Sequence, residues 1–352
     1  MLIFVLILGA VICAGMTAAK KNEFFSDYCS PKNTSTMNAI FSVLIFLSHA
    51  VTYVNLSGAL DGPYLSFRKF LGQLVVITYL FFSGYGIMES IKKKGTDYVK
   101  KMPFHRLFKL WFHFAIVLVM FTVVSVGVRG LEYTPMHYIL SYTGLKSLGN
   151  SNWYMFVTFA MYVIVIISFL IFRKSKALGV GCVVALTTVF VIVEIKAGLQ
   201  TTFYNTVCCF PAGMIFSLVK PYVDKILMKN DIIWFTGFSV CVLAFAYFSQ
   251  NRNETFWHYM LFVLFAMAVI VTFMMKVSIK SSILDWFGQH IFSFFILQRI
   301  PMILMKHFGF NKEPYFFIIV CFFGTVFLSV IFDAFTDKID SFIFKSRKKI
   351  KS

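Results

Sequence analysis

His49 is the residue whose type and surroundings point most directly to chemistry. It lies in the apolar stretch AIFSVLIFLSHAVTYVNL, residues 39–56, where an ionisable side chain is costly unless it serves a function. A rise of ~1.5 Å per residue from Ala39 predicts His49 ~15 Å along a helix, near the middle of a bilayer core of ~30 Å. Because a neutral imidazole accepts protons near neutral pH, we expect a general base rather than a packed polar residue.

The basic segment from Lys92 to Lys109 is a second candidate site. Its cations would bind phosphate groups, or would simply anchor the protein at the cytosolic face of a membrane. Arg106 shares one helical face with Lys109 and His113, at spacings of three and seven residues. We therefore expect Arg106 and Lys109 to bind an anionic ligand, with His113 as a further substrate contact.

Two aromatic residues are weaker candidates, and each has a structural alternative. Tyr85 follows Ser83 and Gly84, small residues that let helices approach closely, and its phenol would donate a hydrogen bond to a bound ligand. Trp153 opens a predicted helix, where it belongs to an interfacial aromatic belt or stacks on a sugar ring.

His290 and Arg299 lie on one predicted helix near the C-terminal end of the chain. Arg299 is deep enough in that helix to need a partner or a water-filled cavity. Pro301 follows, so the helix is expected either to continue or to break and let Arg299 reach the surface. Both residues are candidate substrate contacts.

These side chains are carried by a chain whose composition is that of a membrane protein. Of its 352 residues, 59% are hydrophobic and only 14% are charged, which excludes a water-soluble globule of this size. Runs of ~20 apolar residues predict about eleven transmembrane helices, near residues 2–19, 39–57, 70–90, 104–127, 153–172, 177–194, 201–219, 231–248, 256–275, 286–305 and 314–332.

This all-α polytopic fold is predicted to contain three parts. Residues 1–38 form an additional N-terminal helix and a cytosolic loop, residues 39–335 form a ten-helix membrane domain, and residues 336–352 form a basic cytosolic tail. The first helix lacks a basic n-region, and its lysine pair follows the apolar run, so we interpret it as an uncleaved helix.

The net charge of +18 follows alternate loops rather than one patch. Of the 33 Lys and Arg residues, 24 fall in five loops and a tail on one predicted face. The positive-inside rule then places the N-terminus outside and the C-terminus in the cytosol of a multi-pass cell-membrane protein. The orientation of the protein in the membrane therefore explains its net positive charge better than nucleic acid binding does. The seven Cys show no metal or disulfide spacing, and we expect no bound metal or cofactor.

Five stretches of the chain resemble the acyltransferase-3 family of integral membrane acyltransferases. They are FSVLIFLSHA (41–50), YLFFSGYGI (79–87), KKMPFHRLFKLW (100–111), NWYMFVTFAMYV (152–163) and FGQHIFSFFILQRIPM (287–302). The resemblance implies a ten-helix core and transfer of an acyl group, usually acetyl from cytosolic acyl-coenzyme A. The acceptor it implies is a hydroxyl of a cell-surface glycan or of its lipid-linked precursor.

The resemblance also implies roles for individual residues. It makes His49 the catalytic histidine, and Arg106 and Lys109 the two basic residues of an RL-x-R stretch. The chain departs from the family pattern at four positions: Asn38 replaces an Arg, Lys109 a second Arg, Phe112 a frequent Pro and Gln298 a frequent His. Asn38 and Gln298 are therefore further candidate substrate contacts.

Two other functional classes fit a polytopic chain. A transporter or flippase for an envelope precursor would be favoured by two related halves with interrupted helices, and we find no such symmetry. A membrane-embedded scaffold would explain the helices but gives no reason for His49. Acyl transfer to an alcohol does give one, since it needs a base for the hydroxyl proton and cations for the coenzyme A phosphates.

Overall fold

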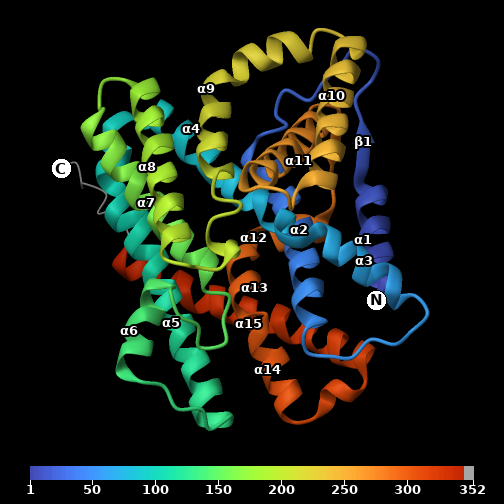
Figure 1. The fold of residues 1–352 in the computed structure, drawn as a ribbon, viewed down its shortest axis with the longest axis vertical. Coiled ribbons are helices and arrows are strands. Elements are labelled where there is room, and N and C mark those ends of the chain that lie inside the picture. The colour runs from blue at the N-terminus through green and yellow to red at the C-terminus, as the bar shows by residue number, and fades with distance from the viewer. Residues whose placement is uncertain (345–352) are drawn as a thin grey trace, which may run out of the picture. The chain divides into compact units, whose positions relative to one another are not determined.

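The structure is a computed structural model that describes residues 1–344, and these residues are almost entirely helical (Figure 1). The chain forms two compact units. Unit 1 comprises Met1–Ser48, Leu56–Val99 and Ile164–Ile291, and unit 2 comprises His49–Asn55, Lys100–Val163 and the chain from Phe292 onward. The all-α fold that the sequence predicts is thereby confirmed. The part of the predicted basic tail beyond residue 344 lies outside the described residues.

Unit 1 holds the N-terminal part of the chain and its central helices. Its elements are α1 (Leu2–Gly15), β1 (Met16–Ala18), most of α2 (Pro31–Ala50), α3 (Asp61–Leu71), η1 (Gly72–Val76), most of α4 (Ile77–Met102), α8 (Lys176–Lys196), η4 (Thr201–Phe203), α9 (Cys209–Leu227), α10 (Asp231–Asn251), α11 (Phe256–Lys276), β2 (Val277–Ile279) and α12 (Ser282–Gln289).

Unit 2 holds the elements that surround the candidate site. They are η2 (Pro103–Phe108), α5 (Lys109–Thr122), η3 (Val123–Val128), α6 (Pro135–Thr143), α13 (Ile291–Leu297), α14 (Arg299–His307), η5 (Phe310–Lys312) and α15 (Pro314–Ile343). Helix α7 (Trp153–Ile171) contributes to both units.

Six helical segments among the described residues are long and apolar enough to cross a membrane. One of them is the 68-residue run Asp61–Val128, which is longer than a single span. It turns at Gly72 and Gly95, whose φ angles of 46° and 61° suit glycine because it has no Cβ. The predicted number of eleven spans is not confirmed, although α7, α8, α10 and α11 lie where helices were predicted.

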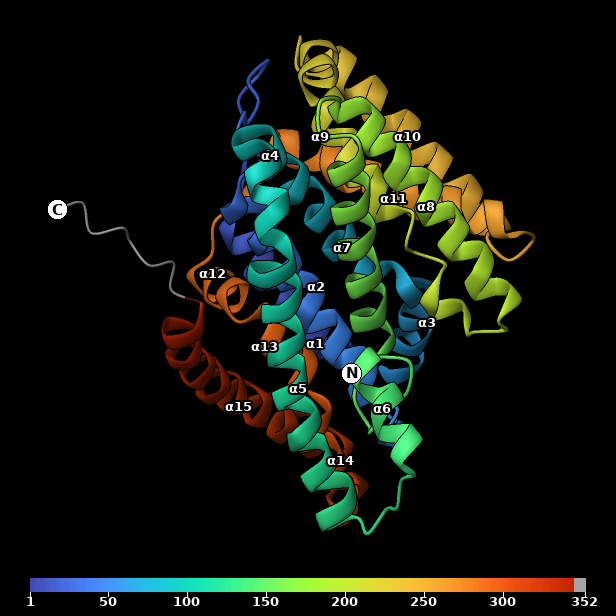
Figure 2. The same ribbon diagram turned by 90° about the vertical axis from the view of Figure 1, so that its left-hand side faces the viewer.

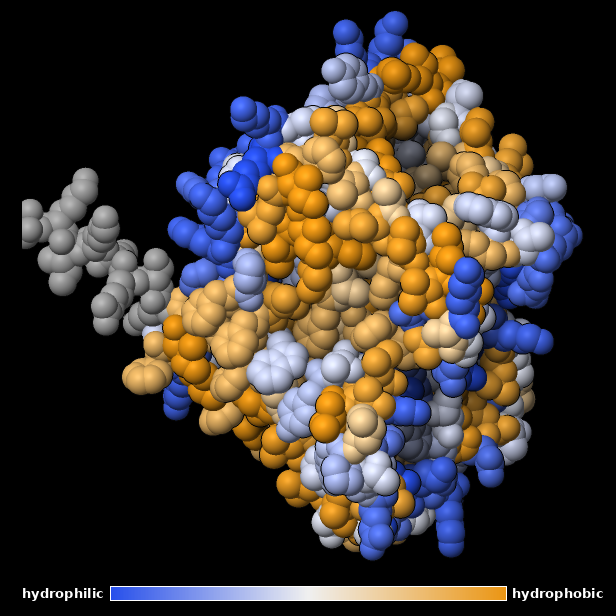
Figure 3. Space-filling model, turned by 60° about the vertical axis from the view of Figure 1, so that its left-hand side comes forward, coloured by the Kyte–Doolittle hydropathy of each residue, from blue (hydrophilic) through white to orange (hydrophobic). Residues whose placement is uncertain are grey.

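The outer surfaces of these helices suit a lipid environment. Large apolar side chains are exposed on α10 and α15, including Ile232 (79%), Leu243 (70%), Phe323 (65%) and Phe327 (65%). No residue of α10 is buried. Apolar side chains also cover much of the face shown in Figure 3. Such surface is unfavourable in water but is the normal outer face of a membrane helix.

The prediction that α2 extends to residue 57 is wrong. The helix begins at Pro31, where Ser30 Oγ accepts a hydrogen bond from the Asn33 amide (3.3 Å), and it ends at Ala50. Beyond it, the amide and the Oγ1 of Thr52 both donate to the His49 carbonyl oxygen, at 3.0 and 2.7 Å. A threonine that competes for this carbonyl favours a turn over another helical turn. His49 therefore lies in the last turn of α2 and not near the middle of a helix.

The predicted helix 286–305 is also broken, into α12, α13 and α14. Proline has no amide hydrogen and clashes with the carbonyl four residues earlier. For Pro301 that residue is Leu297, where α13 ends. The break leaves Gln298 between the helices and makes Arg299 the first residue of α14.

Three other predicted boundaries differ from the structure. The first helix ends at Gly15, after which β1 pairs antiparallel with β2, and the predicted helix 201–219 begins only at Cys209. Helix α15 continues to Ile343 rather than stopping near residue 332. Hydropathy marks the apolar part of α15 but not its polar last turns, where Asp340 pairs with Lys109.

Candidate active site

Two antiparallel helices define the two ends of unit 2. Lys109 of α5 lies 2.5 Å from Asp340 near the end of α15, and Tyr53 stacks on Phe317 near the start of α15, with ring centroids 6.3 Å apart. Phe317 and Asp340 are separated by ~35 Å along the helix. Unit 2 therefore has a Lys109 end and a Tyr53 end, and Figure 2 shows α5 and α15 running in opposite directions.

The Lys109 end contains a small ionic network. Asp340 accepts from the Lys109 ammonium at 2.5 Å through one carboxylate oxygen, and its other oxygen lies 2.9 Å from His113 Nε2. The His113 ring packs against the rings of Phe292 and Phe332, with each centroid 6.2 Å from that of His113. Arg106 is exposed on η2, about one turn before Lys109. The structure thus brings Lys109 and His113 together through Asp340, while Arg106 faces outward.

The Tyr53 end contains cations around a phenol. The Arg299 guanidinium donates a hydrogen bond to the Tyr53 hydroxyl, and the Lys306 ammonium lies 5.8 Å from the centre of its ring. Burial raises the pKa of the Tyr53 phenol, and the positive charges of Arg299 and Arg129 oppose this effect. Asn311 Nδ2 donates to the Tyr53 carbonyl oxygen at 2.9 Å, which fixes the backbone there.

His49 belongs to the Tyr53 end of unit 2. Four residues of chain span at most ~14 Å, so His49 cannot lie far from Tyr53. Its imidazole is half-buried. One residue earlier, the Ser48 carbonyl and hydroxyl oxygens accept from Arg68 Nε at 3.0 and 3.1 Å. That contact satisfies the Ser48 carbonyl, one of the last carbonyls of α2, and fixes the backbone next to His49.

The break between α13 and α14 places polar groups beside the loop that precedes α7. Gln298 is fully buried, and its Nε2 donates to the Phe295 carbonyl at 2.7 Å. The Phe295 ring lies 5.2 Å from that of Tyr154, and Gly149 packs against Ile303. The segment from Gly149 to Tyr154, which includes half-buried Trp153, therefore runs along residues 295–303.

Three of the residues that the sequence suggested for the site, Asn38, Tyr85 and His290, lie in unit 1 instead. Tyr79 donates from its hydroxyl to the Asn38 carbonyl at 3.1 Å, whereas Asn38 Oδ1 is buried without a hydrogen-bond partner among residues 1–344. The Tyr85 ring lies 6.0 Å from Phe216, and the His290 ring 4.4 Å from Trp286. The substrate-contact roles of Asn38 and His290 and the ligand-binding role of Tyr85 stay predictions.

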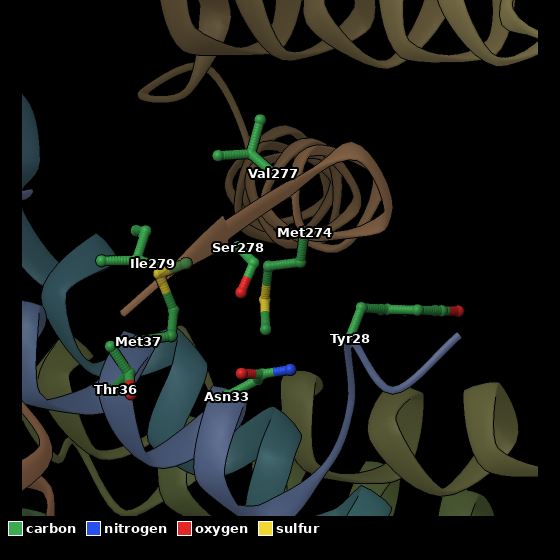
Figure 4. Close-up of a pocket in the computed structure, with 8 residues that line it drawn as sticks. All are labelled: Tyr28, Asn33, Thr36, Met37, Met274, Val277, Ser278 and Ile279. Carbon is green, nitrogen blue, oxygen red and sulfur yellow. The ribbon is translucent and has the colours of Figure 1, made fainter. Parts of the chain in front are cut away.

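Unit 1 also contains a small cavity, shown in Figure 4. Its volume of about 20 Å³ suits one water molecule and not a substrate. In Figure 4 the Asn33 amide and the Ser278 hydroxyl face one another across it, whereas the Tyr28 ring points away. This cavity is therefore better suited to a structural water than to chemistry.

Sequence reasoning missed Asp340, Tyr53 and Arg129. Asp340 had a visible signal, because it follows Asp333 by seven residues and so lies on the same helical face. Tyr53 and Arg129 had none, since each lies just outside a helix and gains its surroundings from distant parts of the chain.

Comparison with protein families identifies the fold to which this arrangement belongs. The family model for the acyltransferase domain matches residues 36–334, which is most of the chain and includes Lys109, His113 and Tyr53 but not Asp340. No curated protein and no solved structure matches. The histidine of α2, the basic stretch on η2 and α5 and the polar break before α14 all lie within the matched region. The chain therefore belongs to the acyltransferase-3 family of membrane acyltransferases.

Proposed function

We propose that this enzyme transfers an acyl group, most simply acetyl, from cytosolic acyl-coenzyme A to a hydroxyl of a cell-surface glycan or a lipid-linked precursor. The observation that carries the proposal is the position of His49 at the end of unit 2 opposite the basic stretch of Arg106 and Lys109. The base and the donor-binding cations would then work at opposite ends of one helical unit.

The chemical step follows from the properties of imidazole. Neutral His49 would take the proton of the acceptor hydroxyl as its oxygen attacks the thioester carbonyl carbon. The tetrahedral intermediate then collapses, the carbon–sulfur bond breaks, and the coenzyme A thiolate leaves and is protonated. The products are an ester and free thiol, with no change of oxidation state.

Arg106 is a candidate for the donor phosphates because its side chain is exposed. The charge of Lys109 is opposed by Asp340. A guanidinium binds phosphate through two parallel hydrogen bonds, which suits coenzyme A. Lys109 and Arg129 lie ~30 Å apart along α5 and η3, about the thickness of a bilayer core. The Arg106 end would face the cytosol, as the charge distribution predicts.

The test is transfer of radiolabelled acetyl from acetyl-coenzyme A to an extracted surface glycan by the protein in lipid nanodiscs. We expect His49→Gln to lower the rate ~10²- to 10⁴-fold, as loss of a general base does. His307→Gln is the matched control, because His307 is exposed at the end of α14. Parent-like transfer by folded His49→Gln would show that His49 is a packing residue.

A further inference from the structure

We propose that the Tyr53 end of unit 2 binds an oxyanion, a phosphate or carboxylate group, carried by the acyl acceptor. Arg299 and Arg129 would hold this group close to Tyr53. The identification of the ligand as an acceptor rests on the proposed function, whereas anion binding itself does not.

The first argument is uncompensated positive charge. Arg299, Arg129 and Lys306 all interact with Tyr53. None of the ion pairs found within residues 1–344 involves any of these three cations. At the other end of unit 2, by contrast, Lys109 is neutralised by Asp340. Arg129 and Lys306 are exposed to solvent, whereas Arg299 is half-buried. An external anion would therefore stabilise Arg299 most, because its charge has no carboxylate within ion-pairing distance among these residues.

The second argument is the buried Nε of Arg299. This atom has no hydrogen-bond partner in the described part of the chain, although the guanidinium donates elsewhere to Tyr53. A buried donor left without an acceptor costs free energy, and more so when it is charged. An oxyanion bound at Arg299 would supply that acceptor. The planar guanidinium group suits the paired oxygens of a phosphate or a carboxylate.

The third argument comes from the segment that runs along α14. Asn150 and Ser151 are 2% and 5% exposed, and Gln298 is fully buried. Asn150 Nδ2, Ser151 Oγ and Gln298 Oε1 have no hydrogen-bond partner within residues 1–344. Amide and hydroxyl groups of this kind match the hydroxyls of a sugar that carries the anion. Gln298 adjoins Arg299 in the chain, and Asn150 and Ser151 belong to the segment that runs along residues 295–303. These groups indicate a polar ligand rather than a lone ion.

The position of this cluster distinguishes acceptor from donor. Arg129 lies ~30 Å from Lys109 along one continuous helix, so the cluster is separate from the Arg106 stretch. His49, the proposed base, lies within ~14 Å of Tyr53. A group held here would bring an acceptor hydroxyl toward His49 while the donor phosphates occupy the opposite end.

Equilibrium binding to the full-length protein in nanodiscs, without any acyl donor, tests the anion site. The ligands are a hexose phosphate, a uronic acid and the neutral methyl glycoside of the same sugar. We expect at least one anionic sugar to bind about tenfold or more tightly than the neutral glycoside, with an affinity that falls as salt rises. The preferred anion identifies the acceptor as phosphorylated or as a uronic acid.

Arg299→Gln should weaken that binding ~10- to 100-fold. Arg299→Lys should weaken it less, because Lys keeps the positive charge but lacks the planar guanidinium group. Arg129→Gln should weaken it as well. Lys312→Gln is the matched control, since Lys312 is an exposed cation on η5. Coenzyme A binding should be unchanged in all four variants. Loss of coenzyme A binding in Arg299→Gln would instead assign the cluster to the donor and overturn the proposal.

The same measurements separate this proposal from the acyltransferase reaction. Equal binding of anionic and neutral sugars, or parent-like binding by Arg299→Gln and Arg129→Gln, would overturn the anion site even if acetyl transfer is observed. Arg299-dependent anion binding without any acetyl transfer would uphold the site and reject the proposed reaction.

Discussion

The Lys109 ammonium lies 2.5 Å from the Asp340 carboxylate, so the second basic residue of the RL-x-R stretch already has an anionic partner. The Asp340 side chain is only 13% exposed, and its other oxygen faces His113. This pairing limits how strongly Lys109 attracts a phosphorylated donor, because its charge is largely compensated within unit 2.

Asp340→Asn should strengthen coenzyme A binding about threefold or more at low ionic strength, since it removes the charge that opposes Lys109. The gain should fade as salt is added. Titration of coenzyme A against the protein at two salt concentrations measures both effects. Asp337→Asn is the control, because Asp337 is exposed and forms no ion pair among the described residues. Unchanged affinity in Asp340→Asn would show that the charge of Lys109 does not contribute to coenzyme A binding.

Arg106→Ala should raise the acyl-coenzyme A concentration needed for half-maximal transfer ~10-fold or more. Arg106→Lys should raise it less, because the charge remains while the bidentate geometry is lost. Steady-state kinetics over a range of acetyl-coenzyme A concentrations compares the two. The same donor dependence in both variants and the parent would leave Arg106 as a membrane anchor only.

The contact between α4 and α9 predicts a stability effect that distinguishes Gly84 from Gly86. A Cβ on Gly84 would clash with the Phe210 carbonyl oxygen, whereas a Cβ on Gly86 would meet no atom within 4 Å. We expect Gly84→Ala to lower stability by about 1–3 kcal/mol, as overpacking does, and Gly86→Ala to have little effect. Thermal unfolding in detergent measures both, and equal melting temperatures would contradict the close helix approach.

Burial raises the pKa of the Cys29 thiol to about 12 from its ordinary value near 9. The nearby Lys220 charge lowers the pKa but does not reverse the shift. The thiol therefore stays protonated at pH 8, and only the thiolate reacts readily. In a variant that keeps Cys29 as its single cysteine, iodoacetamide labelling should be slow until the protein is denatured. Rapid labelling of the folded protein would show that the thiol is accessible and ionised.

The orientation of the chain is testable at two exposed positions, Lys94 and Glu132. The division of positive charge predicts that Lys94 faces the cytosol and that Glu132 faces the opposite side. In a cysteine-free background, an impermeant maleimide applied to intact cells should label Glu132→Cys and not Lys94→Cys. Labelling of Lys94→Cys alone would reverse the topology.

The sequence by itself determined the kind of protein and most of its helices. The hydropathy of a segment depends only on its own residues. The helices α7, α8, α10 and α11 could therefore be located without knowledge of their neighbours in the fold. The motif around His49 and the basic stretch near Arg106 are likewise local in sequence, and they were sufficient to recognise the family. The small residues near Gly84 also predicted the close helix packing that the structure contains.

Only the tertiary structure decided which charges are compensated and which are not. Lys109 and Asp340 are 231 positions apart in the chain, and Tyr53 and Arg299 are 246 apart. The spacing of residues along the sequence cannot predict such pairs, because they depend on which faces of distant helices pack together. The end of α2 was missed for a related reason: the segment after His49 is apolar, but the Thr52 side chain captures the His49 carbonyl and stops the helix.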